Sequence, residues 1–474
     1  MTQTKTLAVC SSPLAIGIRP EHIENHCHNC LCKRQPSELK RCTGCYYARY
    51  CTAKCQKEDW ARIHRLECKS LKQSQYYQET EIAIKQALNG ETNAALALIV
   101  FRLYLLSKHG ELRKQEGVFT KRTFDDLMMH DISIRKSPSK MTLFRGISQL
   151  VLDDFKEGKD KASNIKISAE LFDMFCKVAV NTHSLYEWEE SGNCLQIALA
   201  LSLDISAYDH SCRPNADLYT RGRSTYVIPI DSDTDVFNTK QTFIPYVNLI
   251  APRWARQNFL KCNYFFDCQC TRCADKGDDF LTSIKCEQCK KPIPMDENDP
   301  GQSQKCEECG ETQHKDWIKR SKRMMQRLRN FTGTGCPLED QDFEADKDLA
   351  EEMEEMTLTQ QIQVLLKVKA EAELLLPTSN VYYSLLMGKM ADIQGSHRAE
   401  CALKYYTTVR LTYPPRYGRT LLTEGMWAVN ILYEAEAKEM VKKVLKEIQE
   451  GIDTYFIVGG CPFLDRIFYI RDRV

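Results

Sequence analysis

Cysteine is the residue type whose number and spacing indicate chemistry most directly in this chain of 474 residues. The chain contains 23 cysteines, and most of them lie in short clusters, many as Cys-x2-Cys pairs. Two thiolates at this spacing can bind the same metal ion in a tetrahedral site. Met1–Leu14 lacks the basic-then-apolar pattern of a secretory signal peptide, so we expect a reducing compartment in which disulfides are rare. Cysteine clusters in such a protein indicate zinc.

The first cluster spans residues 27–68 and offers eight potential ligands in four pairs. These ligands are Cys27, Cys30, Cys42, Cys45, Cys51, Cys55, His64 and Cys68. Eight ligands suffice for two zinc ions with four protein ligands each and no open position, so the expected role is structural. A segment this short buries little apolar core, and structural zinc can contribute about 10–16 kcal/mol of apparent folding free energy. A short helix over Lys57–Arg65 is expected to present His64.

Two further clusters lie in the second half of the chain. One is a Cys-x-Cys-x2-Cys group that lacks a fourth ligand, which Cys212 could supply, and its members are Cys268, Cys270 and Cys273. The other consists of two Cys-x2-Cys pairs 16 residues apart, a spacing typical of a zinc ribbon that binds one ion, and its ligands are Cys286, Cys289, Cys306 and Cys309. The sequence therefore predicts about four zinc ions. Other cysteines, such as Cys10, Cys176, Cys262 and Cys401, are expected to be buried as small hydrophobic residues.

Long helical segments are expected between the first and second clusters. Apolar residues recur at helical spacing from Ala94 to Leu105 and from Leu171 to Val178. The polar stretch Ser137–Lys140 is predicted to be a loop between helices. No apolar run reaches the roughly 18 residues that span a bilayer, so the longest run is predicted to be a buried helix.

Strands are expected where the helical period stops, within residues 181–250. Thr225–Ile230 and Thr242–Val247 are rich in β-branched and aromatic residues and predict two strands, separated by the polar loop Asp231–Lys240. From about residue 316 to the end the pattern is helical again. The elements together predict an α+β protein with a helical C-terminal domain.

The balance of charge excludes some classes of partner. With 65 basic and 64 acidic residues, the net charge of +1 gives no overall attraction to nucleic acid or to an anionic membrane. The basic residues near the first cluster are too few to favour a nucleic-acid backbone. We therefore expect an intracellular protein of the nucleus, the cytoplasm or both, with no membrane partner and no direct binding to nucleic acid.

The first cluster resembles the MYND zinc finger. The run from Tyr50 to Cys68 carries the Tyr-Cys, Cys-Gln, Trp and His-Cys marks of that family in order. The resemblance implies interleaved ligation, in which one ion is held by Cys27, Cys30, Cys51 and Cys55, and the other by Cys42, Cys45, His64 and Cys68. It also implies a surface that binds other proteins, with proline-rich peptides as typical partners.

With the motif Asp209-His-Ser-Cys-x-Pro-Asn215 and the second cluster, the finger resembles the SET and MYND domain family of protein lysine methyltransferases. The resemblance runs from about Lys5 to Cys273 and, more loosely, through the helical C-terminus. It implies a SET β-fold split by the finger and followed by a helical domain similar to tetratricopeptide repeats. The expected segments are a SET remnant at 1–26, the finger at 27–68, a helical SET insert at 69–180, the SET core at 181–250, a post-SET zinc at 251–280, the zinc ribbon at 281–315 and the helical domain at 316–474.

The same resemblance implies an enzyme that transfers a methyl group from S-adenosylmethionine to a lysine of a protein, histones included. Tyr246 matches the catalytic tyrosine of the family. The positions that match cofactor contacts are Asn181, Asp209, His210, Tyr264 and Phe266, and those near the substrate pocket are His183 and Ser206.

Three departures from the family pattern favour an alternative function. The glycine-rich strand pair that wraps the cofactor is expected to be missing, because Leu7–Leu14 resembles the strand that follows it. Asp209 replaces an asparagine, and a carboxylate cannot donate the amide hydrogen bonds. His183 stands where a channel phenylalanine is common. The alternative is an adaptor with weak or no catalysis that binds partner proteins through its finger and helical domain.

Overall fold

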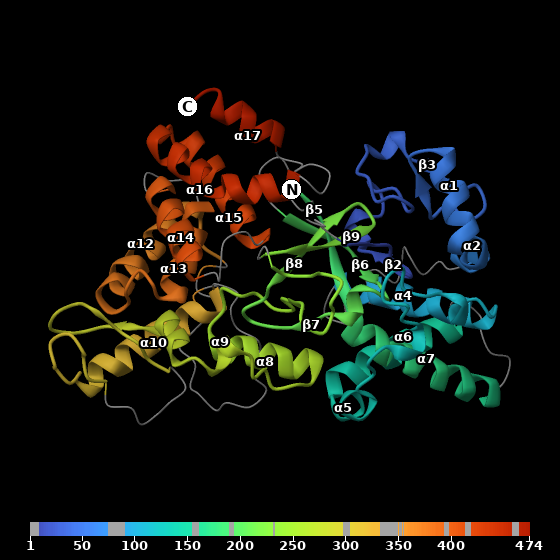
Figure 1. The fold of residues 1–474 in the computed structure, drawn as a ribbon, viewed down its shortest axis with the longest axis horizontal. Helices are drawn as coiled ribbons and strands as arrows, with labels where there is room; N and C mark the ends of the chain where they lie inside the picture. Colours follow the sequence, from blue (N-terminus) through green and yellow to red (C-terminus); the bar gives the residue numbers. More distant parts are fainter. Residues whose placement is uncertain are drawn as a thin grey trace. The chain divides into compact units, whose positions relative to one another are not determined.

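The chain is a mixed α and β protein in the computed structural model, as the sequence predicts (Figure 1). The structure describes residues 9–73, 91–153, 161–188, 194–230, 233–296, 304–331, 349, 353, 355–392, 398–412, 419–456 and 464–474. These residues divide into two compact units. Unit 1 comprises Met1–Trp188, Cys194–Asp209 and Leu218–Phe243, and unit 2 comprises Glu189–Asn193, His210–Asp217 and Ile244–Val474.

Two three-stranded sheets carry most of the described strands of unit 1. In the first sheet, β6 (Cys194–Leu201) lies between β2 (Ala15–Ile18) and β5 (Thr182–Trp188). In the second, β9 (Ser224–Pro229) lies between β1 (Val9–Ser11) and β8 (Ala216–Arg221). Strands β2 and β6 thus bring together segments that are far apart in the sequence, with the whole finger between them.

Helices of unit 1 cover the first sheet. Helix α4 (Glu91–Lys108) packs against β2 and β6, and it also contacts α6 (Pro138–Asp153) and α7 (Lys161–Asn181) (Figure 1). A Cβ atom at Gly17 of β2 would lie 1.9 Å from the Ala95 carbonyl oxygen of α4, so only glycine permits this close approach. The predicted buried helix near Ala94 is confirmed, because α4 is buried almost throughout from Ala95 to Leu106.

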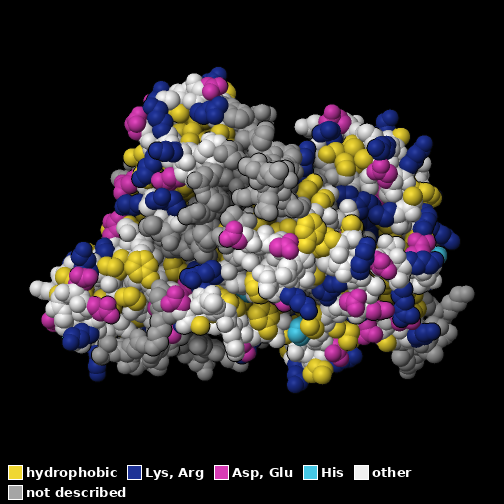
Figure 2. All heavy atoms as spheres, viewed as in Figure 1, with side chains coloured by type: hydrophobic (Ala, Val, Ile, Leu, Met, Phe, Trp, Pro, Cys, Tyr) yellow, Lys and Arg dark blue, Asp and Glu magenta, His cyan; other side chains and the backbone are white. Residues whose placement is uncertain are grey.

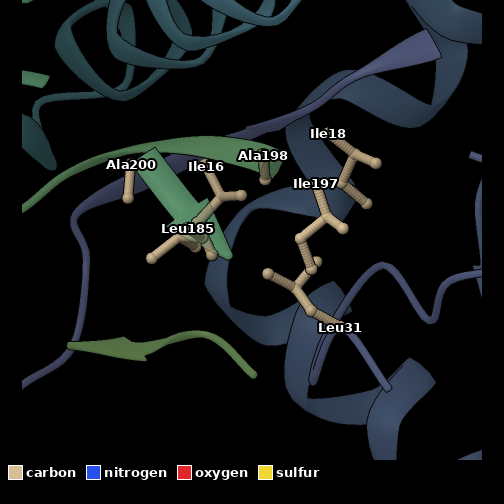
Figure 3. Packing of buried hydrophobic residues seen from close by; sticks show 7 residues of the cluster. All are labelled: Ile16, Ile18, Leu31, Leu185, Ile197, Ala198 and Ala200. Carbon is tan, nitrogen blue, oxygen red and sulfur yellow. The ribbon is translucent and has the colours of Figure 1, made fainter. Parts of the chain in front are cut away.

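The finger joins unit 1 through shared apolar packing. Leu31, which directly follows the first Cys-x2-Cys pair, is 2% exposed and belongs to a buried cluster with Ile18 and Ile197 (Figure 3). The other members are Ile16, Leu185, Ala198 and Ala200. The finger itself contains the short strands β3 (Lys40–Arg41) and β4 (Arg49–Tyr50) and the helices α1 (Ala53–Asp59) and α2 (Arg65–Gln73).

Unit 2 is mostly helical. After α8 (Arg253–Tyr264) and α9 (Thr271–Ala274), the strands β11 (Ile284–Lys285) and β12 (Pro292–Ile293) belong to the predicted ribbon. The C-terminal helices are α10 (Lys315–Phe331), α12 (Leu358–Leu375), α13 (Val381–Asp392), α14 (Arg398–Thr412), α15 (Arg419–Glu434), α16 (Lys438–Phe456) and α17 (Leu464–Arg471). Each helix from α12 to α16 contacts the next one along the chain, which confirms the predicted helical C-terminal region.

Several local predictions were wrong for identifiable reasons. Ser137–Lys140 is not a loop, because Pro138 opens α6 at a position where a missing N–H costs nothing. The strand expected at Thr242–Val247 is reduced to β10 (Phe243–Ile244), since Pro245 cannot donate to a ladder. Cys10 is exposed because it points outward from β1, and Cys262 is exposed on α8, whereas Cys176 and Cys401 are buried.

The boundaries proposed for the seven segments stay a prediction. Among the described helices, none combines the length and the apolar composition that crossing a membrane requires. The short helix α5 (Asp131–Lys136) contacts α6 and α7, and strand β7 (Asp209–His210) pairs with β10.

Candidate functional site

Among the residues that the structure describes, four groups of cysteine and histidine side chains each have their ligand atoms within 4.8 Å of one another. Two lie in the finger, and their members are Cys27, Cys30, Cys51 and Cys55, and Cys42, Cys45, His64 and Cys68. The other two lie in unit 2, and their members are Cys212, Cys268, Cys270 and Cys273, and Cys286, Cys289, Cys306 and Cys309. The structure therefore brings together the sets that the sequence suggested, and each offers the four soft donors that fit a closed zinc site.

The two Cys-x2-Cys pairs of the finger and the two of the ribbon share one backbone geometry. The N–H of the residue after the second cysteine donates to the carbonyl of the first cysteine, at 2.8–3.1 Å. These residues have φ angles between 59° and 75°, and they are Leu31, Tyr46, Lys290 and Gly310. The left-handed conformation turns the chain so that both thiols face one point, and three of the four positions adopt it without glycine.

The second finger cluster is supported by a buried chain of charges. His64 lies at the end of a π-helical turn between α1 and α2, with Nε2 3.6 Å from the Cys45 sulfur. Its Nδ1 lies 3.2 Å from Glu67, and Arg102 of α4 donates two hydrogen bonds to that carboxylate, at 2.7 and 2.8 Å. Arg102 also donates to the Ile16 carbonyl of β2. A histidine ligand held by a carboxylate in this way keeps its Nε2 lone pair for the metal.

The electrostatics of this chain depend on its members being present together. Burial opposes ionisation of Glu67, but Arg102 and His64 hold the pKa of that carboxyl far below its usual range. Glu67 and Arg102 are both buried, so each charge relies on the other for compensation. Neighbouring Tyr50, also buried, donates its hydroxyl to Asp59 at 2.8 Å, which gives a structural reason for the tyrosine of the finger motif.

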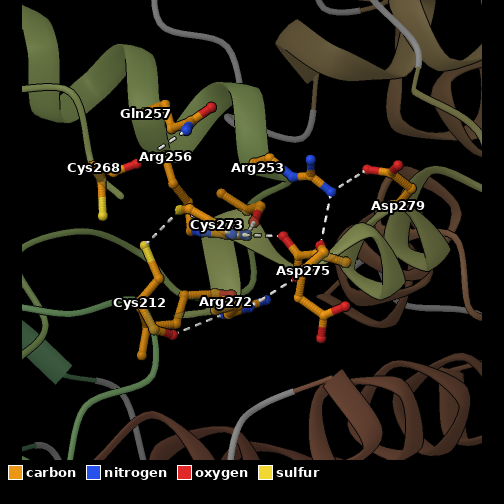
Figure 4. Close-up of polar contacts among 12 residues, drawn as sticks. Cys212, Arg253, Arg256, Gln257, Cys268, Arg272, Cys273, Asp275 and Asp279 are labelled. Carbon is orange, nitrogen blue, oxygen red and sulfur yellow. Dashed lines mark hydrogen bonds and ion pairs between the residues drawn. The ribbon is translucent and has the colours of Figure 1, made fainter. Parts of the chain in front are cut away.

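The cluster around Cys212 has a different kind of support (Figure 4). Two buried arginines, Arg256 and Arg272, share the carboxylate of Asp278, at 2.6 and 2.9 Å. Arg256 lies 3.8 Å from the Cys273 sulfur, and Arg272 donates to the Cys212 carbonyl at 3.3 Å. Four thiolates around Zn²⁺ carry a net charge of −2, and the two guanidinium groups partly offset it in a buried setting.

Aromatic side chains of unit 2 gather beside this cluster. The rings of Tyr246 and Tyr264 have centroids 4.8 Å apart, and the His210 ring lies 5.3 Å from Tyr246 and 6.2 Å from Phe266. Phe265 ends α8 in the left-handed conformation with φ 61°. This turn lets Tyr264 and Phe266, on either side of it, lie near the same pair of rings. The structure thus brings together four residues predicted for the site.

His210 is held at both ring nitrogens. Its Nδ1 accepts the backbone N–H of Tyr246 at 3.0 Å, and its Nε2 lies 3.2 Å from the Cys212 sulfur. Burial lowers the pKa of His210 to about 4, so the ring is neutral at pH 7. The ring therefore sits between the tyrosine and the cysteine cluster.

Four predicted site residues belong to unit 1. Asn181 ends α7, and its amide donates to the carbonyls of Lys177 and Met128, both at 2.8 Å. The Nε2 atom of His183 lies 2.8 Å from the Thr225 hydroxyl, and burial lowers the pKa of that histidine to about 4.

The other two predicted residues of unit 1 lie close together in the sequence. Ser206 donates its hydroxyl to the Leu203 carbonyl, and its own carbonyl accepts from Arg122, both at 2.8 Å. Asp209 is exposed. The contacts of Ser206 anchor the main chain just before the motif that begins at Asp209.

Buried charged residues are the part of the site that sequence reasoning missed. Asp204 accepts hydrogen bonds from three consecutive backbone N–H groups, of residues 118–120, and from the hydroxyls of Ser11 and Thr120. Arg102 interrupts an apolar helical run, and a lone charge in such a run is the signal that could have revealed it. Arg256 and Asp278 give no such local signal.

The surface of the finger carries hydrophobic side chains among basic ones. Tyr46 and Trp60 are 61% and 47% exposed. Figure 2 shows Lys and Arg side chains around hydrophobic ones over the region of β3, α1 and α2. Exposed aromatic residues of this kind are common in surfaces that bind other proteins.

Residues 27–68 match the family model of the MYND finger. Over 303 residues the chain is 26% identical to "SET domain-containing protein 14" of Caenorhabditis elegans, covering 64% of this chain and 62% of that protein. It is 27% identical over 277 residues to "Histone-lysine N-methyltransferase SMYD3" of Homo sapiens, covering 57% of each. It is 26% identical over 268 residues to "N-lysine methyltransferase SMYD2" of Mus musculus, covering 54% of this chain and 52% of that protein.

The chain therefore spans between 52% and 62% of the length of these three curated relatives. The finger matches on its own, and the longer likenesses extend beyond its 42 residues into the rest of the chain. The chain therefore carries a MYND finger and is similar over more than half of its length to proteins of the SET and MYND domain family.

Proposed function

We propose that the protein is a protein-lysine N-methyltransferase that uses S-adenosylmethionine, with histone lysines among its substrates. The observation that carries the proposal is the group of aromatic rings formed by Tyr246, Tyr264, Phe266 and His210 beside a cysteine cluster. The relatives named as lysine methyltransferases support it.

The reaction requires a neutral lysine amine and a line from the nitrogen through the methyl carbon to the sulfur. A lysine with an ordinary pKa near 10.4 resists deprotonation at neutral pH by about 4 kcal/mol. Aromatic walls exclude water and so favour the neutral amine, and they restrict the approach of the side chain. In the proposed site Tyr246 orients the amine with its hydroxyl, and Tyr264 and Phe266 line the approach.

The aromatic rings of the proposed site suit the positive charge of S-adenosylmethionine. The faces of aromatic rings attract a cation, and the sulfonium group is one. When bound, the cofactor supplies the methyl group. We propose that Tyr264 and Phe266 lie beside it, and that Asn181, Asp209 and His210 contribute contacts, while His183 and Ser206 border the substrate. The Oδ1 atom of Asn181 is left to accept, because its amide nitrogen already donates to two carbonyls.

Zinc has a structural part in this proposal. The four cysteine-rich groups would hold one ion each, which fixes the segments that carry Cys212, Tyr246 and Phe266. Reduced thiols of this number suit a reducing compartment, so we place the protein inside the cell, in the nucleus, the cytoplasm or both. The exposed rings of Tyr46 and Trp60 support binding of proline-rich peptides by the finger.

Two measurements on the purified zinc-loaded protein test the proposed activity. Calorimetric titration with S-adenosylmethionine should show binding of one equivalent. Tyr246→Phe should lower methyl transfer by about 10²-fold, a loss typical of removing a positioned catalytic group, and leave cofactor affinity nearly unchanged. Tyr469→Phe is the matched control, because Tyr469 is an exposed tyrosine of the same unit.

Failure of these measurements would point to the adaptor. If the protein binds no cofactor at millimolar concentration, or if Tyr246→Phe transfers methyl groups as fast as the parent, the proposed mechanism is wrong. The exposed carboxylate at Asp209, where the family motif has an asparagine, is the feature that favours this outcome.

A further inference from the structure

The backbone N–H of Tyr246 has an unusual acceptor. Strand β10 ends at Ile244, whose carbonyl accepts the N–H of Ser211 at 3.3 Å. Pro245 has no N–H, so it cannot continue the ladder. The next donor along the chain is the Tyr246 N–H, and it donates to the Nδ1 atom of the His210 ring at 3.0 Å. A side chain thus takes the place of a strand at the point where Tyr246 leaves the sheet.

This hydrogen bond fixes the tautomer of His210. A backbone N–H can only donate, so Nδ1 must carry the lone pair, and the ring proton of the neutral imidazole lies on Nε2. The Nε2 atom lies 3.2 Å from the Cys212 sulfur and therefore donates to it. One imidazole connects the main chain of Tyr246 to a cysteine of the unit 2 cluster.

The connection depends on what the sulfur binds. Cys212 belongs to a four-cysteine group, and its sulfur lies 3.6 Å from that of Cys273. A thiolate held by zinc accepts a hydrogen bond more strongly than a thiol, because it carries negative charge. Zinc at this cluster therefore strengthens the hydrogen bond that His210 donates to the Cys212 sulfur. The same hydrogen bond stabilises the negative charge of the thiolate.

We propose that His210 is a positioning residue that couples zinc at the Cys212 cluster to the placement of Tyr246. The inference rests on the proposed function and deepens it, because Tyr246 is the proposed catalytic residue. Both nitrogens of the ring are already occupied by the protein, so the cofactor contact proposed for His210 would come from its main chain and is separate from this role of the ring. One ring then holds the Tyr246 main chain through Nδ1 and the Cys212 ligand through Nε2, and each contact can be removed separately.

Two substitutions separate the halves of this connection. In His210→Asn the amide oxygen lies near the position of Nδ1 and can accept the Tyr246 N–H, but the side chain is too short to reach Cys212. In His210→Gln the amide nitrogen lies near the position of Nε2 and can donate to Cys212, while the acceptor for Tyr246 is lost. His314→Asn and His314→Gln are matched controls, because His314 is an exposed histidine of unit 2.

Each of the two hydrogen bonds of His210 has its own readout, and neither readout needs the cofactor. Hydrogen exchange of the peptide that contains Tyr246, followed by mass spectrometry, reports the N–H bond. Release of zinc to a chromogenic chelator reports the sulfur bond, and Cys212→Ser, which lacks this ion, identifies the phase that belongs to the cluster. We expect His210→Gln to speed exchange about tenfold with zinc release near that of the parent. We expect His210→Asn to speed zinc release about tenfold, as loss of a partner of a metal ligand does, with exchange near that of the parent.

If both variants lost exchange protection and zinc retention to the same extent, the proposal would be overturned, because His210 would then act only by packing. Unchanged exchange in His210→Gln would overturn it as well. In methyl-transfer assays both variants should lower kcat with little change in cofactor affinity, whereas loss of a cofactor contact made by the ring itself would do the reverse. If the parent neither binds the cofactor nor transfers methyl groups, the proposed function fails, while exchange and zinc release still decide whether the connection exists.

Discussion

The finger cluster of Cys42, Cys45, His64 and Cys68 and the ribbon cluster of unit 2 use the same knuckle geometry but differ in their surroundings. All four ligands of this finger cluster are buried, whereas Cys309 of the ribbon cluster is exposed. The finger ligand His64 is held by Glu67, which Arg102 holds from a helix 35 residues further along the chain. The ribbon cluster is held by Gln313, which donates to the Cys286 sulfur at 3.3 Å from within the ribbon itself.

This difference teaches how far the effect of a metal ion can extend. In the finger, zinc orients His64, and the charges that hold His64 also reach the Ile16 carbonyl of β2. Zinc there should stabilise the first sheet of unit 1 as well as the finger. The ribbon is hydrogen-bonded to helices of unit 2, for example through Lys285 and the Glu373 carbonyl of α12, so loss of its ion should affect unit 2 and leave the first sheet of unit 1 unchanged.

The largest effect is expected from Arg102→Met. The substitution leaves the buried carboxylate of Glu67 without its partner, which costs about 3–5 kcal/mol when a buried ion pair is broken. Urea unfolding of the zinc-loaded protein measures the change in free energy of unfolding. Arg320→Met is the control, because Arg320 is half exposed and 4.0 Å from Glu371, and it should cost at most about 1 kcal/mol.

A second substitution at Glu67 sharpens this result. If the cost comes from the unpaired charge, adding Glu67→Gln to Arg102→Met should recover part of the lost stability. Equal or greater loss in the double variant would mean that packing rather than charge is responsible. Both variants should release zinc from the finger faster, because His64 loses its support.

Removal of single ions should separate the two regions next. Cys309→Ser and Cys45→Ser should each lower the zinc content by one equivalent, as measured by elemental analysis. We expect Cys45→Ser to lower the thermal unfolding midpoint of unit 1 and Cys309→Ser to leave it nearly unchanged, because only the finger ion is tied to β2. In the parent protein a chelator should remove the ribbon ion first, and that fast phase should be missing from Cys309→Ser. A single common phase for all ions would contradict the contrast.

Local patterns in the sequence predicted much of this fold. The apolar residues from Ala94 to Leu105 predicted α4 correctly, because the helical period is a local signal and can be recognised without knowing which elements pack against the helix. Strands β5 and β6 were expected only as part of a region, because the sheet that they form is completed by β2, which pairs with β6 across some 180 positions of the sequence. Pro138 and Pro245 were read as ordinary residues of their segments, although proline decides where α6 begins and where β10 ends.

The candidate site was predictable where ligands are spaced by short intervals. Cys-x2-Cys pairs reveal themselves locally, and the family resemblance supplied the interleaved pairing in the finger. Charged partners such as Arg256 and Asp278 are 22 residues apart and follow no period, so nothing in the sequence marks them as a pair. The side chain of His210 illustrates the same limit, because its two contacts are set by the turn at Pro245 and by the cysteine cluster together.

A partly buried histidine, His183, provides a smaller contrast within unit 1. His183 contacts the Thr225 hydroxyl, and burial lowers its pKa from 6.5 to about 4. The unfolded chain therefore binds a proton below about pH 6.5 while the folded chain does not, so stability falls as the pH drops from 6.5 towards 4. His183→Phe should remove about 1–2 kcal/mol of that fall, measured by urea unfolding at pH 7.5 and 5 with zinc in excess. An equal fall in the variant would show that other groups account for it.

The smallest expected effects concern the left-handed residues that both regions share. Gly310 has φ 75°, and no atom lies within 4 Å of the point that an added Cβ would occupy, so Gly310→Ala tests the backbone conformation alone and should cost about 1 kcal/mol. Lys290→Gly relieves the same strain in the preceding knuckle but removes a cation 5.2 Å from the Trp317 ring, so the two effects should nearly cancel. In the finger, Tyr46→Gly relieves strain at an exposed residue and should stabilise by up to about 1 kcal/mol. Zinc-dependent unfolding of each variant measures these changes, and a loss of stability in Tyr46→Gly as large as that in Gly310→Ala would show that the knuckles are not equivalent.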